Sequence, residues 1–279
     1  MNYKQLTIYN YKLSYYFIRI FGFIWLILQY VDFQTFVKRS NDFYKPTVWL
    51  QKIFFLNFPT AVYFYFLLLI CGISLLVSLL KPSVFINIFS FFLIAIINLP
   101  LASYHNIGHH NHLFILCFFL SIFLVPKNLK LSDFKNVQYF QLGLLMTYSV
   151  SGFWKLVSMA KDIVLREPDI SWFESDAAKL NTYTNFHFID QLPPEFIIKI
   201  YSYQSFWSIV TVFAIFIQAF SFLGAFNRKI LNVVMIFTIV FHLYNTYFVL
   251  ADFTIAIFVV LILLFPYHYF KTKRGNFQA

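Results

Sequence analysis

The chain has 279 residues, of which 60% are hydrophobic, 23% aromatic and only 11% charged, and its mean hydropathy is +0.70. Soluble domains carry roughly a quarter charged residues, so this composition excludes a water-soluble globular protein and indicates a polytopic membrane protein. The net charge of +10 is scattered among short segments, which argues against nucleic-acid binding. Two cysteines in apolar runs exclude a disulfide framework.

Several apolar segments are long enough to cross a bilayer as helices, which takes about 20 residues each. We expect an all-α, polytopic transmembrane helix bundle of about eight spans, forming a single integral membrane domain over 1–279. Arg19 lies in the first span, where its side chain either reaches the headgroups or faces the other helices. The last two spans meet across 245–252 in a tight or broken turn. The eight spans are expected at about 12–31, 60–80, 84–102, 111–126, 138–158, 200–224, 230–250 and 252–267.

Basic residues orient the bundle because short cytoplasmic loops carry an excess of Lys and Arg. With eight spans, one side holds a single acid, Asp133, and eleven basic residues: Lys4, Lys12, Lys81, Lys127, Lys130, Lys135, Arg228, Lys229, Lys271, Lys273 and Arg274. The other side holds nearly all the acids. We therefore expect both termini to be cytoplasmic. An external loop is expected at about 159–199, with interfacial helical pieces and Trp172.

A few ionisable residues fall within the expected spans, where a charge costs about 2.5–3.5 kcal/mol and is a functional candidate. Lys155 lies 20 residues beyond Lys135, or roughly 30 Å along a helix. His242 lies 13 residues beyond Lys229, or about 20 Å. His112 opens the fourth span. A lysine and two histidines from three helices thus predict one site in the outer half of the membrane.

Each candidate also has a purely structural alternative. Lys155 either acts in a site or extends toward the headgroups beside Trp154. His242 either acts there or is a hydrogen-bonded packing residue. Asn245 either lines the site or satisfies the backbone of the turn. Asp252 is expected to cap the last helix.

Four histidines lie within the stretch HNIGHHNH, residues 105–112. On a helix, His105, His109 and His112 would share a face, and imidazole is the commonest metal ligand. However, Gly108 weakens the helix and no acidic residue follows nearby to orient the rings, so no metal is expected. We expect His112 to be used in acid–base or hydrogen-bonding chemistry. It, rather than the histidines at 105, 109 and 110, should point into the bundle toward Lys155.

The segments NHLFILCFFLSIF, QLGLLMTYSVSGFWKL and FHLYNTYFVLADFTIAIFVVLILLF occur in this order. They resemble the transmembrane domain shared with vitamin K-dependent γ-glutamyl carboxylase, the HTTM family. That family shows an Asn-His pair opening one helix, a Gly-x-x-Lys-Leu ending the next, and a Phe-His with a following Asn. The resemblance covers about 12–268. Short bacterial members resembling the sporulation-delaying protein B type are associated with maturation of secreted antimicrobial peptides or toxins.

The resemblance implies a carboxylase-like fold and a set of site residues. Lys155 falls on the lysine that acts as base toward the quinol, and His112 falls on the histidine that assists quinol oxygenation. A base needs a neutral amine, which burial favours. The implied cofactors are a reduced naphthoquinone of the vitamin K or menaquinol type, O2 and, for a carboxylase (a lyase), CO2. The positions expected to bind the quinol are Asn111, Trp154, His242 and Asn245.

The function implied by the resemblance is a quinol-coupled, O2-dependent membrane enzyme that modifies a secreted peptide at the outer face. The carboxylase itself carries a further domain in which peptides dock, whereas this sequence ends at Ala279. A second subunit in place of that domain is one candidate partner. The alternative is a non-catalytic membrane factor for maturation, export or immunity of an antimicrobial peptide or toxin. Membrane lipid, quinol and an exported peptide are the expected partners, and nucleic acid is not.

Overall fold

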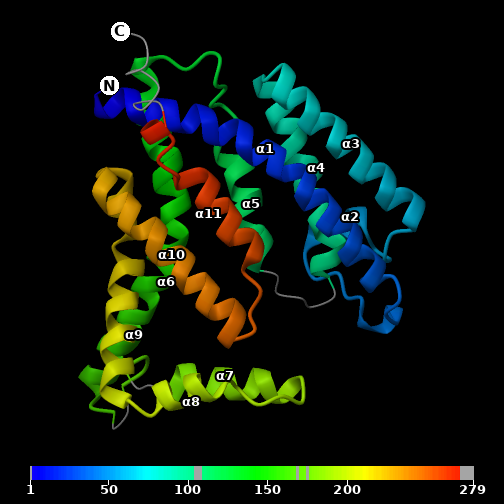
Figure 1. Ribbon diagram of the computed structural model, residues 1–279. Helices are drawn as coiled ribbons and strands as arrows, with labels where there is room; N and C mark the ends of the chain where they lie inside the picture. The colour runs from blue at the N-terminus through cyan, green and yellow to red at the C-terminus, as the bar shows by residue number, and fades with distance from the viewer. Residues whose placement is uncertain (1, 104–108, 168–169, 174–175, 271–279) are drawn as a thin grey trace. The chain divides into compact units, whose positions relative to one another are not determined.

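A computed structural model of the chain describes residues 2–103, 109–167, 170–173 and 176–270, without the side chains of 109–110 and 176–178. The described residues are 78% helical and contain no strand (Figure 1). The prediction of an all-α protein is confirmed. The α-helices are α1 (Tyr3–Phe36), α2 (Trp49–Phe54), α3 (Ala61–Leu80), α4 (Val84–Ala102), α5 (His109–Leu120), α6 (Phe134–Leu165), α7 (Asp176–Phe188), α8 (Glu195–Tyr201), α9 (Gln204–Ala219), α10 (Arg228–Phe248) and α11 (Thr254–Leu264). Three short 3₁₀ helices are η1 (Asn41–Phe43), η2 (Leu131–Asp133) and η3 (Ser221–Ala225).

Four of the described helices, α1, α3, α4 and α10, are long and apolar enough to cross a membrane. The pair α8 and α9 makes a fifth if the two are taken together, although they meet at an angle of 88°. Helices α5 and α11 are apolar but shorter, and α6 is long but more polar. These lengths and compositions are compatible with an integral membrane protein.

Polar side chains fix where the long apolar helices begin. The Asn2 side chain accepts the Gln5 backbone N–H, and the Gln5 side chain accepts the Asn2 N–H in return, forming a capping box at the start of α1. Thr60, Ser83 and Asn227 cap α3, α4 and α10 in the same way, each accepting a backbone N–H from the first turn. These caps satisfy donors that apolar surroundings would otherwise leave unpaired.

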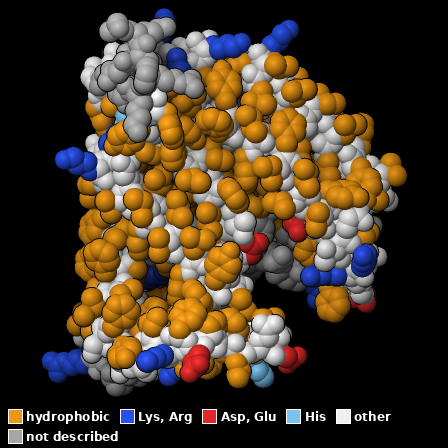
Figure 2. All heavy atoms as spheres, viewed as in Figure 1, with side chains coloured by type: hydrophobic (Ala, Val, Ile, Leu, Met, Phe, Trp, Pro, Cys, Tyr) orange, Lys and Arg blue, Asp and Glu red, His pale blue; other side chains and the backbone are white. Residues whose placement is uncertain are grey.

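Apolar side chains remain exposed along these helices. Val62 on α3, Phe85 on α4 and Ile209 on α9 are each more than two-thirds exposed. On the visible face, such side chains cover much of α3 and α9, while Lys and Arg side chains lie near helix ends (Figure 2). This distribution suits helices whose flanks contact lipid and whose ends contact water.

The chain divides into two compact units. The first contains residues 1–137 and 262–279, and the second contains residues 138–261. Helix α6 therefore begins in the first unit and continues into the second.

A fully buried arginine organises the first unit. Arg19 on α1 donates from Nε to Ser78 Oγ on α3 at 2.7 Å and from Nη2 to Asn87 Oδ1 on α4 at 3.0 Å. The Tyr15 hydroxyl also donates to Asn87 Oδ1, at 2.6 Å, and the Tyr15 ring lies 3.2 Å from the guanidinium carbon. The Asn87 amide donates to the carbonyl of Ile122 just beyond α5. Arg19 thus faces the other helices, which was one of its two expected positions.

In the second unit, α7 and α8 lie side by side and run across the direction of α6 and α9 (Figure 1). A chain of three hydroxyls joins these helices, from the buried Thr182 on α7 and Tyr201 on α8 to the partly buried Tyr244 on α10. Ile197, Tyr201 and Trp207 form a small core where α8 meets α9. Residues 159–165 continue α6, and α7 and the start of α8 follow within 159–199, so this segment contains helical pieces, while its external position stays a prediction.

The connection between α10 and α11 is the expected tight turn. The N–H of Ala251 donates to the carbonyl of Asn245 at 3.0 Å, and Leu250 adopts a left-handed φ of 54°. Asp252 Oδ1 accepts the N–H of Thr254, the first residue of α11, at 2.8 Å. Asp252 therefore caps the last helix, as predicted.

Candidate functional site

Lys155 lies on the part of α6 that belongs to the second unit and is half-buried. Its Nζ donates to Oε1 of the buried Gln218 on α9 at 3.0 Å. Two aromatic rings flank the amine: the Trp172 centroid lies 4.9 Å away and the Phe241 centroid 5.8 Å away. The amine is therefore held by a neutral amide and by ring faces, and among the described residues no carboxylate forms an ion pair with it.

Gly152 explains how Gln218 reaches the lysine. A Cβ at Gly152 would lie 2.2 Å from the backbone nitrogen of Ala219, so the backbones of α6 and α9 are in direct contact there. Next to this contact, the hydroxyls of Ser149 and Ser221 lie 2.8 Å apart. Only glycine permits such an approach. The Gly-x-x-Lys spacing thus places the lysine one turn beyond the point where α6 touches the end of α9.

His242 lies close to the lysine site through Phe241, its neighbour on α10. The Phe241 and His242 ring centroids lie 5.8 Å apart, and His242 is only 4% exposed. Its Nε2 is 2.9 Å from the hydroxyl of Tyr148, which lies seven residues, or about two helical turns, before Lys155 on α6. Its ring also stacks on Phe253 at 4.5 Å. Its Nδ1 is buried and has no hydrogen-bond partner among the described residues.

The segment that carries Trp172 is attached to the end of α6. The N–H of Ser171 donates to Asp162 Oδ2 at 2.8 Å. The hydrogen bonds from the side chain and backbone of Ser171 hold the pKa of Asp162 below its usual value. The hydrogen bonds from Ser171 stabilise Asp162 only while its carboxylate is ionised. They are therefore fully formed above the ordinary pKa of an aspartate, and they weaken as the pH falls through the lowered pKa of Asp162.

Asn111 and His112 belong to the first unit and differ in environment. Asn111 is buried, accepts the Trp25 indole N–H at 2.8 Å, and donates to Asn98 Oδ1 at 2.8 Å. The side chain of His112 is exposed within α5. Because Lys155 belongs to the second unit, the expectation that His112 points toward it stays a prediction.

The remaining histidines of the 105–112 stretch fall in places where the side chains are not described. His105 lies outside the described residues, and His109 and His110 are described only as part of α5. Among the side chains that the structure does describe, no group of three or more His, Cys, Asp or Glu could hold a metal ion.

Asn245 and Trp154, which were also expected at the site, have surroundings unlike those of Lys155. The Asn245 amide donates to the carbonyl of Phe241, one turn earlier on α10, at 2.8 Å. Its side chain therefore bonds to the backbone within α10 and not to the backbone of the turn that follows. Trp154 is 73% exposed, so its indole lies at the surface of the second unit.

The sequence analysis did not single out Gln218, Tyr148 or Phe253. Gln218 carries a visible signal, because it is the one amide in the apolar run VTVFAIFIQAF and polar residues within spans mark functional or packing positions. Tyr148 and Phe253 carry no such signal. Both are aromatic residues among 40 Phe and 19 Tyr, and only the fold shows which of them contact the histidine.

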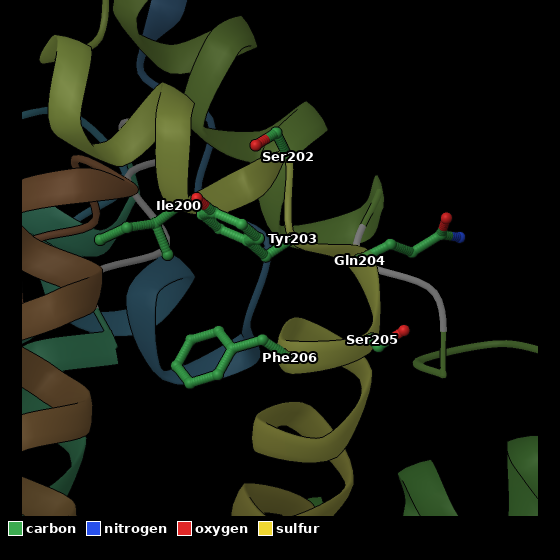
Figure 3. Close-up of a pocket in the computed structure, with 6 residues that line it drawn as sticks. All are labelled: Ile200, Ser202, Tyr203, Gln204, Ser205 and Phe206. Carbon is green, nitrogen blue, oxygen red and sulfur yellow. The ribbon is translucent and has the colours of Figure 1, made fainter.

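A separate cavity of about 680 Å³ lies at the bend between α8 and α9. Ile200, Tyr203 and Phe206 extend to one side of the bend, whereas Gln204 and Ser205 extend to the other (Figure 3). Its lining is therefore apolar on one side and polar on the other.

Comparisons of this chain with protein-family models, with curated proteins and with solved structures find no match. The functional assignment therefore depends on the residues themselves.

Proposed function

We propose that this protein is a quinol-coupled, O2-dependent membrane enzyme that modifies an exported peptide, in the manner of vitamin K-dependent carboxylase-like proteins of the HTTM family. The observation that carries the proposal is the environment of Lys155. Its amine is bonded to the neutral amide of Gln218 and lies against aromatic rings. A neutral amide and ring faces favour the charged form of an amine less than a carboxylate does, and a general base needs the neutral form.

The residues around Lys155 fit a flat, hydroxyl-bearing ligand such as a reduced naphthoquinone. Phe241 and Trp172 offer ring faces, and His242 Nδ1 is a buried polar atom without a hydrogen-bond partner among the described residues. Lys155 would take a proton from a ligand hydroxyl, and His242 would hydrogen-bond to the ligand. When bound, a reduced naphthoquinone supplies the electrons that O2 consumes and thereby the driving force for removing a proton from carbon.

The proposal includes a topology. The four long apolar helices, the bent pair α8–α9 and the helices α5, α6 and α11 together make up the eight spans of a single carboxylase-like membrane domain. Both termini would be cytoplasmic, and the site would face the outside of a bacterial inner membrane. Alkaline phosphatase fused within residues 37–48 should be active, whereas fusion within residues 127–130 should give an inactive reporter. The reverse pattern would exclude this orientation.

The decisive experiment compares oxygen uptake by purified protein in nanodiscs that contain a reduced naphthoquinone. Lys155→Ala should lower the rate by about 10²–10⁴-fold, the usual contribution of a general base. Lys161→Ala removes an exposed lysine from the same helix and should leave the rate unchanged. His112→Ala and His242→Ala should also lower the rate. Full oxygen uptake by Lys155→Ala would overturn the proposal.

The peptide product gives an independent readout. The mass of the exported partner peptide would be compared between wild-type and Lys155→Ala cells. A mass gain of one carboxyl group, seen only in wild-type cells, is expected if the chemistry is carboxylation.

The second candidate function is that of a non-catalytic factor that binds an exported peptide, with or without a second subunit. The cavity at the α8–α9 bend favours it, because Tyr203 and Phe206 are more than half exposed there and offer apolar surface to a peptide side chain. A partner peptide of unchanged mass, whose release needs Phe206 but not Lys155, would support this function over the first.

A further inference from the structure

The indole of Trp172 contacts the Lys155 amine from outside the helix bundle of the second unit. Trp172 lies 17 residues after Lys155, in the connection between α6 and α7, yet its ring centroid is 4.9 Å from Nζ. The ring is 37% exposed, so it lies between the amine and the surroundings. A lysine above an indole face gains a cation–π attraction, for which Trp is the best aromatic partner.

The backbone around Trp172 is held in an unusual conformation. Its φ is 66°, in the left-handed region that bulky residues rarely adopt. The N–H groups on either side are both engaged: Ser171 donates to Asp162 Oδ2 at 2.8 Å, and Phe173 donates to the carbonyl of Ile170 at 3.1 Å. A strained residue persists only where its surroundings fix it, and such residues cluster at functional sites.

The anchor of this conformation lies on the same face of the same helix as the lysine. Asp162 follows Lys155 by seven residues, which is about two helical turns. Asp162 also accepts the N–H of Glu167 at its backbone carbonyl, at 3.0 Å, just beyond the end of α6. The lysine and the residue that orders the chain around Trp172 therefore move as one body.

We propose that Trp172 is a positioning residue of the lysine site: its indole holds the Lys155 side chain and occupies the face of the amine that a flat substrate ring must reach. Asp162, through Ser171, sets the position of the indole. The use of this arrangement in catalysis rests on the proposed function, but the contact itself does not. An aromatic substrate would exchange one ring face for another at the amine, so the site favours flat aromatic ligands over aliphatic ones.

The test measures access to the amine without quinol, O2 or a peptide. Protein in nanodiscs is treated with an amine-acylating ester, and the rate at Lys155 is measured by peptide mass spectrometry relative to the exposed Lys199. Trp172→Ala should raise this ratio about fivefold, the change that about 1 kcal/mol of cation–π contact produces. Trp172→Phe keeps an aromatic ring at this position and should therefore give a ratio close to that of the wild type. Phe173→Ala, which removes the neighbouring ring, serves as the matched control and should leave the ratio unchanged.

Asp162→Ala provides a second test of the same contact, because this partly exposed residue belongs to no buried core and can be replaced without disturbing one. It should raise acylation of Lys155 in the same direction as Trp172→Ala. The proposal is overturned if both variants leave the ratio within twofold of wild type, or if Phe173→Ala raises it as much as Trp172→Ala does. This test measures acylation of Lys155 and not turnover. A failure of the indole contact can therefore be told apart from a failure of the proposed oxygen-dependent function.

Discussion

The close contact between α6 and α9 at Gly152 makes a sharp prediction about stability. Gly152→Ala adds a methyl carbon 2.2 Å from the backbone nitrogen of Ala219 and 2.6 Å from its Cα. Carbon atoms in contact lie about 3.5–4.0 Å apart, so the two helices must separate by about 1 Å or more. Overpacking costs about 1–3 kcal/mol, and a backbone neighbour cannot turn aside, so we expect a cost near 3 kcal/mol.

A loss of that size should lower the midpoint of thermal unfolding by roughly 6–12 °C for a chain of this size. The measurement is thermal unfolding in detergent micelles, followed by circular dichroism. Gly72→Ala is the matched control, because it gives the same gain in helix propensity of about 1 kcal/mol. Its new methyl carbon lies 3.7 Å from Leu26 Cδ1, an ordinary contact, so its midpoint should stay or rise.

Replacing Ala219 with glycine should not restore the stability lost in Gly152→Ala, because the atoms that clash belong to the backbone of Ala219. The double variant Gly152→Ala/Ala219→Gly should therefore be no more stable than Gly152→Ala alone. If Gly152→Ala unfolds at or above the wild-type midpoint, then α6 and α9 do not approach as described. The bond between Lys155 and Gln218 would then lose its structural basis.

Two further predictions concern buried polar pairs, measured by the same unfolding experiment. Arg19→Met removes a buried charge but leaves the Tyr15 hydroxyl bonded to Asn87, so the free energy of unfolding should change by less than about 1.5 kcal/mol. Asn87→Leu removes the acceptor of both Tyr15 and Arg19 and should lower the free energy of unfolding by about 3 kcal/mol. Equal losses would contradict this account of the cluster. Tyr148→Phe leaves the His242 ring without its partner and should cost about 1–3 kcal/mol, and adding His242→Leu should recover most of that loss. A double variant less stable than Tyr148→Phe would refute the pairing.

Hydropathy alone located the helices well, because a helix in lipid must be apolar along most of its length. The expected span 84–102 coincides with α4, and 60–80 differs from α3 by a single residue. The bend at residues 202–203 was missed, since the run 200–224 is apolar on both sides of it. The packing of Tyr201 against Trp207, at a centroid distance of 4.7 Å, fixes that bend, and such a contact has no local sequence signal.

The candidate site was predictable in part. Lys155 and His242 were found because ionisable residues are rare in apolar segments, and the structure places both in the second unit. Gln218 and Trp172 were not connected to the lysine, because hydrogen bonds and ring contacts between distant segments depend on tertiary packing. Gly152, three residues before Lys155, belongs to the Gly-x-x-Lys pattern of the sequence, and in the structure it is the point where α6 touches α9.

The buried cluster around Arg19 has a consequence for how the protein is made. An arginine near the middle of a lone helix costs about 2.5–3.5 kcal/mol in lipid, and its partners Ser78 and Asn87 are synthesised 59 and 68 residues later. At 5–20 residues per second, the wait is on the order of 3 to 14 s. During biogenesis, α1 should therefore remain at the insertion machinery, shielded from lipid, until α3 and the start of α4 arrive. For the membrane protein proposed above, the order of synthesis would thus set the order of release, and the first helix would enter the bilayer together with its partners.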